Sequence, residues 1–369
     1  MRSTTIGILA FMLALAITGT IDAAVEYSVI DLGPIIANGI SDGGQVVGSF
    51  WGTSRDSHAC LWQSSSGVQD LGTLSIWPPT SDAACSINST GQVVGQAFAG
   101  SGSEHAFLWQ SGAGMQDLGL LSALPPGWVG SGSEATGIND NGQVVGWSTN
   151  SSTHLHAFLW QNAIGMQDLG TLGGSSSYAT AINNGGQVVG YSPSGGLDHG
   201  FLWQSGKGMQ DIGTLGGACD ANSINNLGQV VGTSATSSSH LHAFLWQNGI
   251  GMQDLGTLGG LAASAADIND GGLVVGQSLT SSGVEHAFLW QSGIGMQDLN
   301  GLIDSSLGWT LTNASAINLS GQIVGNGQVG GEGHAYLLTP VPEPSTFVLL
   351  GIGAVSLLAY RWRQRRWTA

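Results

Sequence analysis

The chain has 369 residues, of which 42% are apolar and only 8% are charged, and 61 of them are glycine. This composition excludes a long-helix or coiled-coil protein, and the abundant, regularly spaced Val, Leu, Phe and Trp argue against a disordered chain. The formal net charge is −16, and Arg55 and Lys207 are the only basic residues between Val25 and Pro340. Because affinity for phosphates comes largely from Lys and Arg, we expect no nucleic-acid partner, and a neutral or cationic partner is favoured.

The N-terminus has the composition of a secretory signal peptide. Arg2 precedes an apolar run from Ile6 to Ile17, and small and polar residues continue to Ala23 and Ala24. A basic start, an apolar middle and small residues before the cleavage point are typical of such signals. We expect residues 1–24 to direct export and then to be removed. The alternative is an uncleaved N-terminal anchor.

Four short patterns repeat between residues 25 and 340. Gly-Gln-Val-Val-Gly or a variant of it recurs seven times at steps of 42 to 51 residues, beginning at Gly44, Gly91, Gly142, Gly186, Gly228, Gly272 and Gly321. Ile-Asn precedes most copies, His-Ala-Phe-Leu-Trp-Gln follows them, and Asp-Leu-Gly comes last. Each pattern supplies a short apolar run bounded by Gly, Asn, Asp or Ser, which is typical of β-strands.

Four antiparallel strands in a unit of about 45 residues are typical of a β-propeller blade. The sequence therefore predicts an all-β fold, a seven-bladed β-propeller of four-stranded blades over residues 25–340. The domain opens with a lone Asp-Leu-Gly run and closes with a lone run from His334 to Leu338. We expect the N-terminal strand to complete the last blade. The alternative, an open β array, would need polar end caps that the sequence lacks.

The repeats resemble the HAF family of extracellular repeat proteins, named for residues seen here as His105 to Phe107. The resemblance covers nearly all of the mature chain. It implies an extracellular location and a repeat architecture rather than a particular reaction. Cys60, Gly200 and Tyr336 depart from the pattern at single positions.

Pro342, Glu343 and Pro344 form a Pro-Glu-Pro motif near the C-terminus. On this motif and the segments that follow it, residues 341–369 resemble the PEP-CTERM sorting signal of Gram-negative bacteria. An apolar stretch at 347–360 follows and predicts a short transmembrane helix. Four arginines come next, at Arg361, Arg363, Arg365 and Arg366. We expect these arginines to stay on the cytoplasmic side, which leaves the repeats outside the membrane.

The resemblance to this sorting signal implies a membrane-embedded, exosortase-type processing enzyme as a partner and an exopolysaccharide-producing host. The C-terminal membrane anchor would then be transient. The alternative is a permanent C-terminal anchor, which the apolar stretch alone would provide.

The repeated histidines predict structural hydrogen bonds rather than a metal site. Equivalent residues of different blades lie far apart, whereas zinc needs three or four ligands around one atom. We expect each His to bond within its blade to a repeated Asp, such as Asp117 or Asp168. His154 and His240 lie two residues before a repeat His, which leaves a His-x-His metal site as an alternative. Otherwise we expect no metal and no cofactor.

The three cysteines allow at most one disulfide, which excludes a disulfide-stapled scaffold. They are Cys60, Cys85 and Cys219. The six tryptophans of the repeat pattern, in contrast, are expected to pack in the core between blades.

Tryptophans outside the repeat pattern indicate a binding surface. The tight joints of an antiparallel blade share one face, and the joints of variable length share the other. The variable face would carry Trp51, Trp77, Trp128, Trp147 and Trp309. Aromatic rings on one rim of an exported protein favour sugar as a ligand. The alternative is that these rings only pack beneath longer loops.

The motifs of common enzyme classes do not occur: the sequence has no His-Glu-x-x-His, no phosphate-binding loop and no Gly-x-Ser-x-Gly. We expect an exported, envelope-sorted, non-catalytic propeller that serves as a structural or binding protein of the surface or of the exopolysaccharide matrix. The alternative is a polysaccharide hydrolase or lyase that uses acidic residues on the variable face. If the protein is such an enzyme, we expect two or three polar side chains to converge in one pocket, with no equivalents in the other blades.

Overall fold

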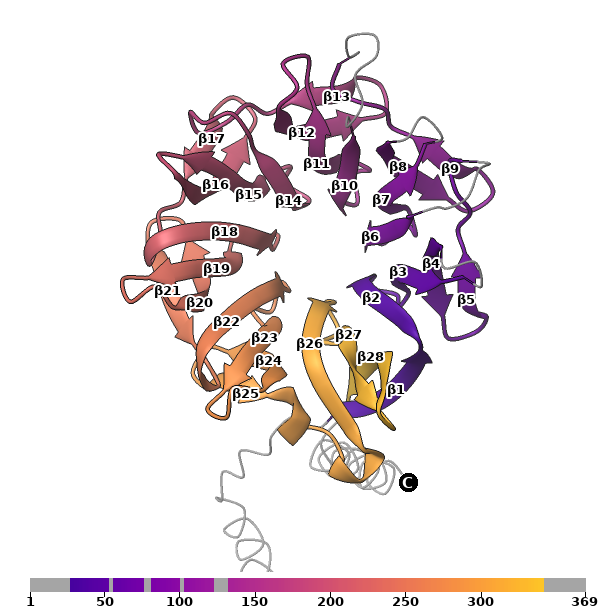
Figure 1. Cartoon of the computed structure of the whole chain (residues 1–369), viewed down its shortest axis with the longest axis vertical. Coiled ribbons are helices and arrows are strands. Elements are labelled where there is room, and N and C mark those ends of the chain that lie inside the picture. The colour runs from indigo at the N-terminus through magenta and orange to yellow at the C-terminus, as the bar shows by residue number, and fades with distance from the viewer. Residues whose placement is uncertain (1–26, 53–55, 76–80, 100–102, 123–131, 342–369) are drawn as a thin grey trace, which may run out of the picture. The chain divides into compact units, whose positions relative to one another are not determined.

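The computed structural model describes residues 27–52, 56–75, 81–99, 103–122 and 132–341. The stretch Ser28–Thr339 forms one compact unit. Seven four-stranded antiparallel sheets are arranged in a ring in this unit (Figure 1). Residues from all seven sheets line a central channel. The predicted seven-bladed propeller of four-stranded blades is therefore confirmed.

The strands follow the four sequence patterns in order, from the channel outwards. The innermost strands are β2 (Ile35–Ile40), β6 (Ala83–Ile87), β10 (Ser133–Ile138), β14 (Tyr178–Ile182), β18 (Gly216–Ile224), β22 (Gly259–Ile268) and β26 (Trp309–Ile317). The second strands are β3 (Val46–Trp51), β7 (Val93–Phe98), β11 (Val144–Thr149), β15 (Val188–Ser194), β19 (Val230–Thr236), β23 (Val274–Thr280) and β27 (Ile323–Val329). Blades are numbered 1 to 7 in the order of these strands.

The two outer positions hold the remaining patterns. The third strands, with the histidine pattern, are β4 (Ser57–Gln63), β8 (Glu104–Gln110), β12 (Leu155–Gln161), β16 (Leu197–Gln204), β20 (Leu241–Gln247), β24 (Glu285–Gln291) and β28 (Glu332–Pro340). The outermost strands are β5 (Gly67–Asp70), β9 (Gly114–Asp117), β13 (Gly165–Asp168), β17 (Gly208–Asp211), β21 (Gly251–Gly256), β25 (Gly295–Asp298) and β1 (Tyr27–Gly33). Two short 3-10 helices precede β26, namely η1 (Leu299–Gly301) and η2 (Ser305–Leu307).

The first strand of the domain closes blade 7. The order of this sheet is β1-β28-β27-β26, so β1 occupies the outermost position, which in the other blades belongs to the same repeat. Across the seam, Asp31 Oδ1 lies 2.9 Å from His334 Nδ1. Leu32 packs in one cluster with Leu337 of blade 7 and Val46 of blade 1. The N-terminal strand thus completes the last blade, as the sequence predicts, and covers the edge of β28.

The two glycines of the Gly-Gln-Val-Val-Gly pattern have different roles. The first lies in the turn between the two inner strands and has a positive φ, 71° at Gly142, which favours glycine. The second lies where the innermost strand comes closest: a Cβ on Gly146 would be 1.8 Å from the carbonyl oxygen of Glu134. The pattern therefore determines both the turn and the close approach of the inner strands.

The apolar core lies between the blades. In one cluster, for example, Val47 of blade 1 packs with Phe107 and Trp109 of blade 2. The phenylalanine of the repeat is fully buried in five blades, and in blade 7 Tyr336 replaces it and donates its hydroxyl to the carbonyl oxygen of Asn313 at 2.8 Å. The repeat tryptophans are buried in four blades and half-buried at Trp62 and Trp246. Because both faces of a blade are apolar, each blade depends on its two neighbours.

A series of buried asparagines joins the blades around the channel. The Nδ2 of each donates to the main-chain oxygen of the equivalent residue in the next blade at 3.0–3.1 Å, in the order Asn88, Asn139, Asn183, Asn225, Asn269, Asn318 and Ser41. Ser41 is the exception among these described residues, because its hydroxyl instead accepts from the main-chain nitrogen of Gln45. The hydrogen-bonded ring therefore has one gap, between blades 1 and 2.

The substitution Ser41→Asn is expected to close this gap and to stabilise the fold. The new turn would read Asn-Asp-Gly-Gly, as residues 269–272 of blade 6 do, and the new amide could donate to the carbonyl oxygen of Asn88. One hydrogen bond contributes about 0.5–1.5 kcal/mol, and the free energy of unfolding in denaturant would measure the gain. The matched control, Asn183→Ser, removes the bond to the carbonyl oxygen of Asn225 and disturbs two bonds to Gln187, and it should cost about 1–3 kcal/mol. An unchanged or lower stability of Ser41→Asn would contradict the role of the ring.

Three sequence predictions concern segments outside the described residues. They are the signal peptide at 1–24, the motif from Pro342 to Pro344, and the transmembrane helix at 347–360 with the arginines that follow it. Among the residues that the structure does describe, no helix is both long and apolar enough to cross a membrane. The signal peptide and the transmembrane helix remain predictions.

Candidate functional site

The blades separate two kinds of connection onto two faces of the ring. One face carries the uniform turns between the first and second strands and between the third and fourth strands. The other face carries connections of variable length: five residues join β11 to β12, whereas two join β15 to β16. We refer to these as the tight-turn face and the variable face.

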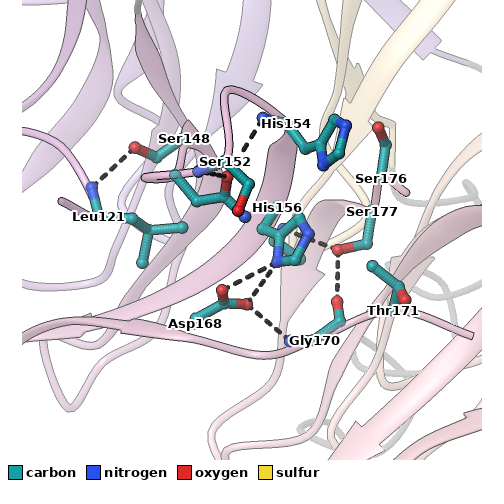
Figure 2. Close-up of polar contacts among 12 residues, drawn as sticks. Leu121, Ser148, Ser152, His154, His156, Asp168, Gly170, Thr171, Ser176 and Ser177 are labelled. Carbon is teal, nitrogen blue, oxygen red and sulfur yellow. Dashed lines mark hydrogen bonds and ion pairs between the residues drawn. The ribbon is translucent and has the colours of Figure 1, made fainter. Parts of the chain in front are cut away.

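Seven histidine–aspartate pairs lie at the variable face, one in every blade. The Nδ1 of each repeat His lies 2.6–3.0 Å from the repeat Asp of its own blade. In blade 3, Asp168 pairs with His156 and also accepts from the main-chain nitrogen of Gly170 at 2.8 Å (Figure 2). The predicted structural hydrogen bonds are confirmed. The pairs join the third strand to the fourth, and their repetition indicates a structural role.

The pKa of the repeat aspartate in blade 2 reflects these bonds. Burial alone would raise the pKa of Asp117, but hydrogen bonds from His105 and from the main-chain nitrogen of Gly119 hold it below its usual value. The bonds therefore favour the charged form of the carboxylate.

Serine side chains connect neighbouring blades beside the His–Asp pairs. Ser177 accepts from the main-chain nitrogen of Ala157 at 2.9 Å and donates to the carbonyl oxygen of Gly170 at 2.6 Å (Figure 2). Ser133 makes the equivalent two bonds between blades 2 and 3. The ring of His154 lies apart from the His–Asp pair of its blade (Figure 2).

The structure does not bring the described tryptophans of the variable face together. Trp51, at the end of β3, is 67% exposed. Trp309 begins β26 and contacts two rings of its own blade edge-on, with centroids 6.1 and 6.5 Å away. Trp147 lies in blade 3 and has partners of its own. Trp77 and Trp128 are outside the described residues.

A group of aromatic and acidic side chains surrounds Trp147. Its ring meets Tyr178 of blade 4 edge-on at 6.4 Å between centroids, and Tyr178 stacks on Tyr191 at 4.9 Å. Glu134, which lies opposite Trp147 in the sheet, accepts a hydrogen bond from it. Burial, with the nearby Tyr178 and Asp220, raises the pKa of Tyr191 to about 12. We call these five residues the aromatic–acidic cluster.

The two carboxyl groups of the aromatic–acidic cluster both have raised pKa values. Burial raises the pKa of Glu134, although hydrogen bonds from Cys85 and Trp147 favour its charged form. Burial and the neighbouring charge of Asp198 raise the pKa of Asp220. The Oδ1 of Asp220 is also buried with no hydrogen-bond partner among the described residues. A buried polar atom without a partner is rare, and Asp82 Oδ2 and Ser122 Oγ are the two others among the described residues.

An alignment of the repeats could have revealed this cluster. Glu134, Tyr178 and Asp220 occupy the same position in three adjacent blades, directly before a fully buried alanine of the innermost strand. The other four blades have Ile36, Ala83, Ser264 and Asn313 there. The features that the repeats share, together with the tryptophans outside the pattern, indicate Trp147 but not Glu134, Tyr178 or Asp220.

Asp267 is a further carboxylate, beside the central channel. Its oxygens accept from Ser223 Oγ at 2.6 Å and from the main-chain nitrogens of Ile268 and Ile317 at 2.9 Å each. Burial raises its pKa in spite of these bonds. Because the three donors come from blades 5, 6 and 7, this carboxylate links blades.

Potential metal ligands are scattered in the structure. Within the described ranges, no three His, Cys, Asp or Glu side chains gather in an arrangement that could hold a metal ion. The three cysteines form no disulfide with one another: Cys60, Cys85 and Cys219 are free thiols.

Comparison with known proteins identifies the C-terminal signal. Residues 340–366 match the model of the PEP-CTERM protein-sorting motif. The chain is therefore an exported protein that carries an envelope-sorting signal of the kind recognised by exosortase-type enzymes. No curated protein matches the chain.

The solved structures that resemble this chain share its propeller fold at low identity. A puromycin hydrolase aligns with a TM-score of 0.54 and 12% identity over 85% of this chain and 54% of that one. A puromycin-hydrolyzing peptidase of Mycobacterium tuberculosis gives 0.52 and 11% over 82% and 49%. TolB from Acinetobacter baumannii gives 0.48 and 11% over 81% and 64%. The chain spans less than two thirds of each of these structures, and the likeness to the two puromycin-hydrolysing proteins shows the fold alone.

The substitution Glu134→Gln is expected to stabilise the fold more at about pH 8 than at about pH 4. Because burial raises the pKa of Glu134 in the folded chain, stability that is complete at low pH is lost as the pH rises through that value. Glutamine resembles the protonated acid and keeps an acceptor for Trp147. Denaturant midpoints at the two pH values measure the effect, with Glu285→Gln at an exposed position of β24 as the control. Equal gains at both pH values would refute the assignment.

Proposed function

We propose that this protein is a non-catalytic surface or extracellular-matrix protein that binds exopolysaccharide on the variable face of its propeller. The observation that supports this function best is the aromatic–acidic cluster. Three aromatic rings contact one another at one point of the ring of blades. The repeated His–Asp pairs and asparagines are engaged in structural bonds, whereas the cluster breaks the repeat.

The chemistry of the cluster favours a sugar chain. Aromatic side chains combine a large apolar face with a polar edge, and binding sites commonly pair such walls with a few polar groups. Glu134 and Asp220 can donate to a hydroxyl when protonated and accept from it when charged. The net charge of −16 disfavours an anionic polymer. We therefore propose a neutral exopolysaccharide.

The sorting motif supports a location at the cell envelope, where such polymers are found. In this proposal the segment 347–360 anchors the chain in the membrane until an exosortase-type enzyme processes it. The repeats would then belong to the HAF type of extracellular repeat, as the residue pattern suggests.

Binding of neutral polysaccharide is expected to weaken when the aromatic rings are removed. Trp147→Ala and Tyr191→Ala should each raise the dissociation constant about tenfold, which corresponds to about 1.4 kcal/mol. Calorimetric titration of the full-length protein in detergent measures this, with Leu241→Ala, an exposed site on the variable face, as the control. The same substitution at Trp51, Trp77, Trp128 and Trp309 tests the tryptophans indicated by the sequence. A dissociation constant that is unchanged in both Trp147→Ala and Tyr191→Ala would contradict the proposed site.

A second candidate function is cleavage of a polysaccharide at the same cluster, either by hydrolysis or by the elimination reaction of a lyase. Glu134 and Asp220 approach the aromatic side chains from different blades and have no counterparts in the other blades. Each has a second acid nearby, Glu104 beside Glu134 and Asp198 beside Asp220. General acid–base cleavage of a glycosidic bond uses a protonated carboxyl group together with a second acid.

The enzyme hypothesis predicts that wild-type protein releases new reducing ends, or an unsaturated product, from a polysaccharide. Glu134→Gln and Asp220→Asn should each lower this rate at least about a hundredfold, because acid–base groups contribute 10²–10⁴-fold. A reducing-sugar assay and ultraviolet absorbance follow the two products. If the wild-type chain binds polymer and leaves its length unchanged, the non-catalytic function stands.

A further inference from the structure

The tight-turn face carries a row of grooves between neighbouring blades. A cavity of about 840 Å³ runs over blades 1 to 3. Further cavities of about 590 Å³ and about 450 Å³ lie between blades 3 and 4 and between blades 4 and 5. Four successive grooves thus open on the face opposite to the aromatic–acidic cluster.

Each groove has the same six lining positions. Between blades 3 and 4 they are Gln143, Gln161 and Gln167 of one blade and Gln187, Trp203 and Gln204 of the next. The same five glutamines and one tryptophan recur between blades 1 and 2, 2 and 3, and 4 and 5. The grooves are therefore four copies of one arrangement, each lined by five glutamine side chains and one tryptophan.

The buried asparagine ring orients these amides. Asn139, which is 3% exposed, donates its Nδ2 to Gln143 Oε1 at 2.8 Å, and Asn183 does the same to Gln187 at 2.8 Å. The amide oxygen is thereby held against the protein. Within the described part of the chain, the Nε2 group of Gln187 has no hydrogen-bond partner, whereas that of Gln143 donates to Gln161 Oε1 at 3.4 Å. A preoriented donor with unused capacity reduces the entropic cost of binding.

The lining is nearly free of available charge. Asp140, Lys207 and Asp211 are the only charged residues among the described lining residues of the three cavities. Asp140 already accepts from Ser89, and Asp211 pairs with His199. Lys207, which lines two of the cavities, donates its Nζ to Gln204 Oε1 at 2.9 Å. An array of neutral amides complements a ligand with many neutral donors and acceptors, which describes the hydroxyl groups of an uncharged sugar chain.

We propose that the four grooves are equivalent subsites for a neutral polysaccharide, so that the tight-turn face binds the polymer multivalently. This inference rests on the proposed binding of exopolysaccharide and adds a second face to it. Four linked weak sites give a polymer an avidity far above that of a single subsite. The row of subsites ends after four grooves, because the other three boundaries between blades lack part of the set of five glutamines and one tryptophan. Leu273, Leu338, Thr339 and Ile30 stand at the missing positions.

The repeat allows all four grooves to be changed with three substitutions. Gln110, Gln161 and Gln204 each line the two grooves that flank their blade, and none of them is buried. The triple variant Gln110→Ala, Gln161→Ala, Gln204→Ala therefore removes one or two amides from every complete groove. Gln291→Ala, at the same strand position beside the incomplete grooves, is the matched control.

The probes are dextran, mannan, galactan and a soluble β-glucan, with alginate as an anionic comparison. They are titrated into the full-length protein in detergent. The triple variant is expected to lower the apparent affinity for the neutral polymer that binds by about tenfold or more, whereas Gln291→Ala stays within about twofold. Circular dichroism during heating checks that all variants keep the wild-type unfolding midpoint.

Each outcome is decisive for the grooves. If the triple variant is folded and binds as wild type does, or if alginate binds more tightly than every neutral polymer, the groove proposal is wrong. If Trp147→Ala and Tyr191→Ala abolish binding and the triple variant does not, the grooves fail while the proposed function survives. If the triple variant loses affinity and the two cluster variants do not, the polymer binds in the grooves and not at the aromatic–acidic cluster. Binding to none of the four neutral polymers would overturn both proposals.

Discussion

Neither face of a blade can remain exposed, and the rest of the structure depends on this constraint. Each sheet presents apolar side chains on both sides, and the core clusters combine residues from two neighbouring blades. A linear stack would leave an apolar face at each end. A closed ring removes both ends, and the pairing of β1 with β28 gives the last blade the same fourth strand as the other six.

The same constraint explains the role of most polar side chains that recur from blade to blade. The His–Asp pairs join the two outer strands, the serines join consecutive blades, and the asparagines form the ring around the channel. Their hydrogen-bonding capacity is used for the fold. A ligand must therefore be sought where a blade departs from the repeat, or where a repeated side chain keeps an unused donor.

The two proposed binding sites lie on opposite faces and differ in how they would bind a ligand. The aromatic–acidic cluster is a single site, so its geometry and its protonation state can select a ligand. The glutamine grooves occur four times in succession, so they can add avidity for a polymer without a strong individual contact. Both kinds of site are poor in free positive charge, and both therefore favour the same neutral class of ligand.

The sequence by itself determined the number of blades, the strand patterns, the closing strand and the His–Asp bonds. It could do so because these features repeat, and a pattern that occurs seven times reports a common local structure. It also revealed the sorting signal, which is a linear motif. The interpretation of individual tryptophans was less complete, because Trp147 lies in a group with Tyr178 and Tyr191, which are far from it in sequence.

Only the tertiary structure decided which side chains meet across the boundaries between blades. The contact of Trp147 with Tyr178 and the lining of each glutamine groove depend on the distance and orientation of adjacent sheets, which no strand encodes alone. The raised pKa values of Glu134 and Asp220 likewise arise from burial by neighbouring blades. The repeat thus specifies the blade, and the packing of one blade against the next creates the candidate binding surfaces.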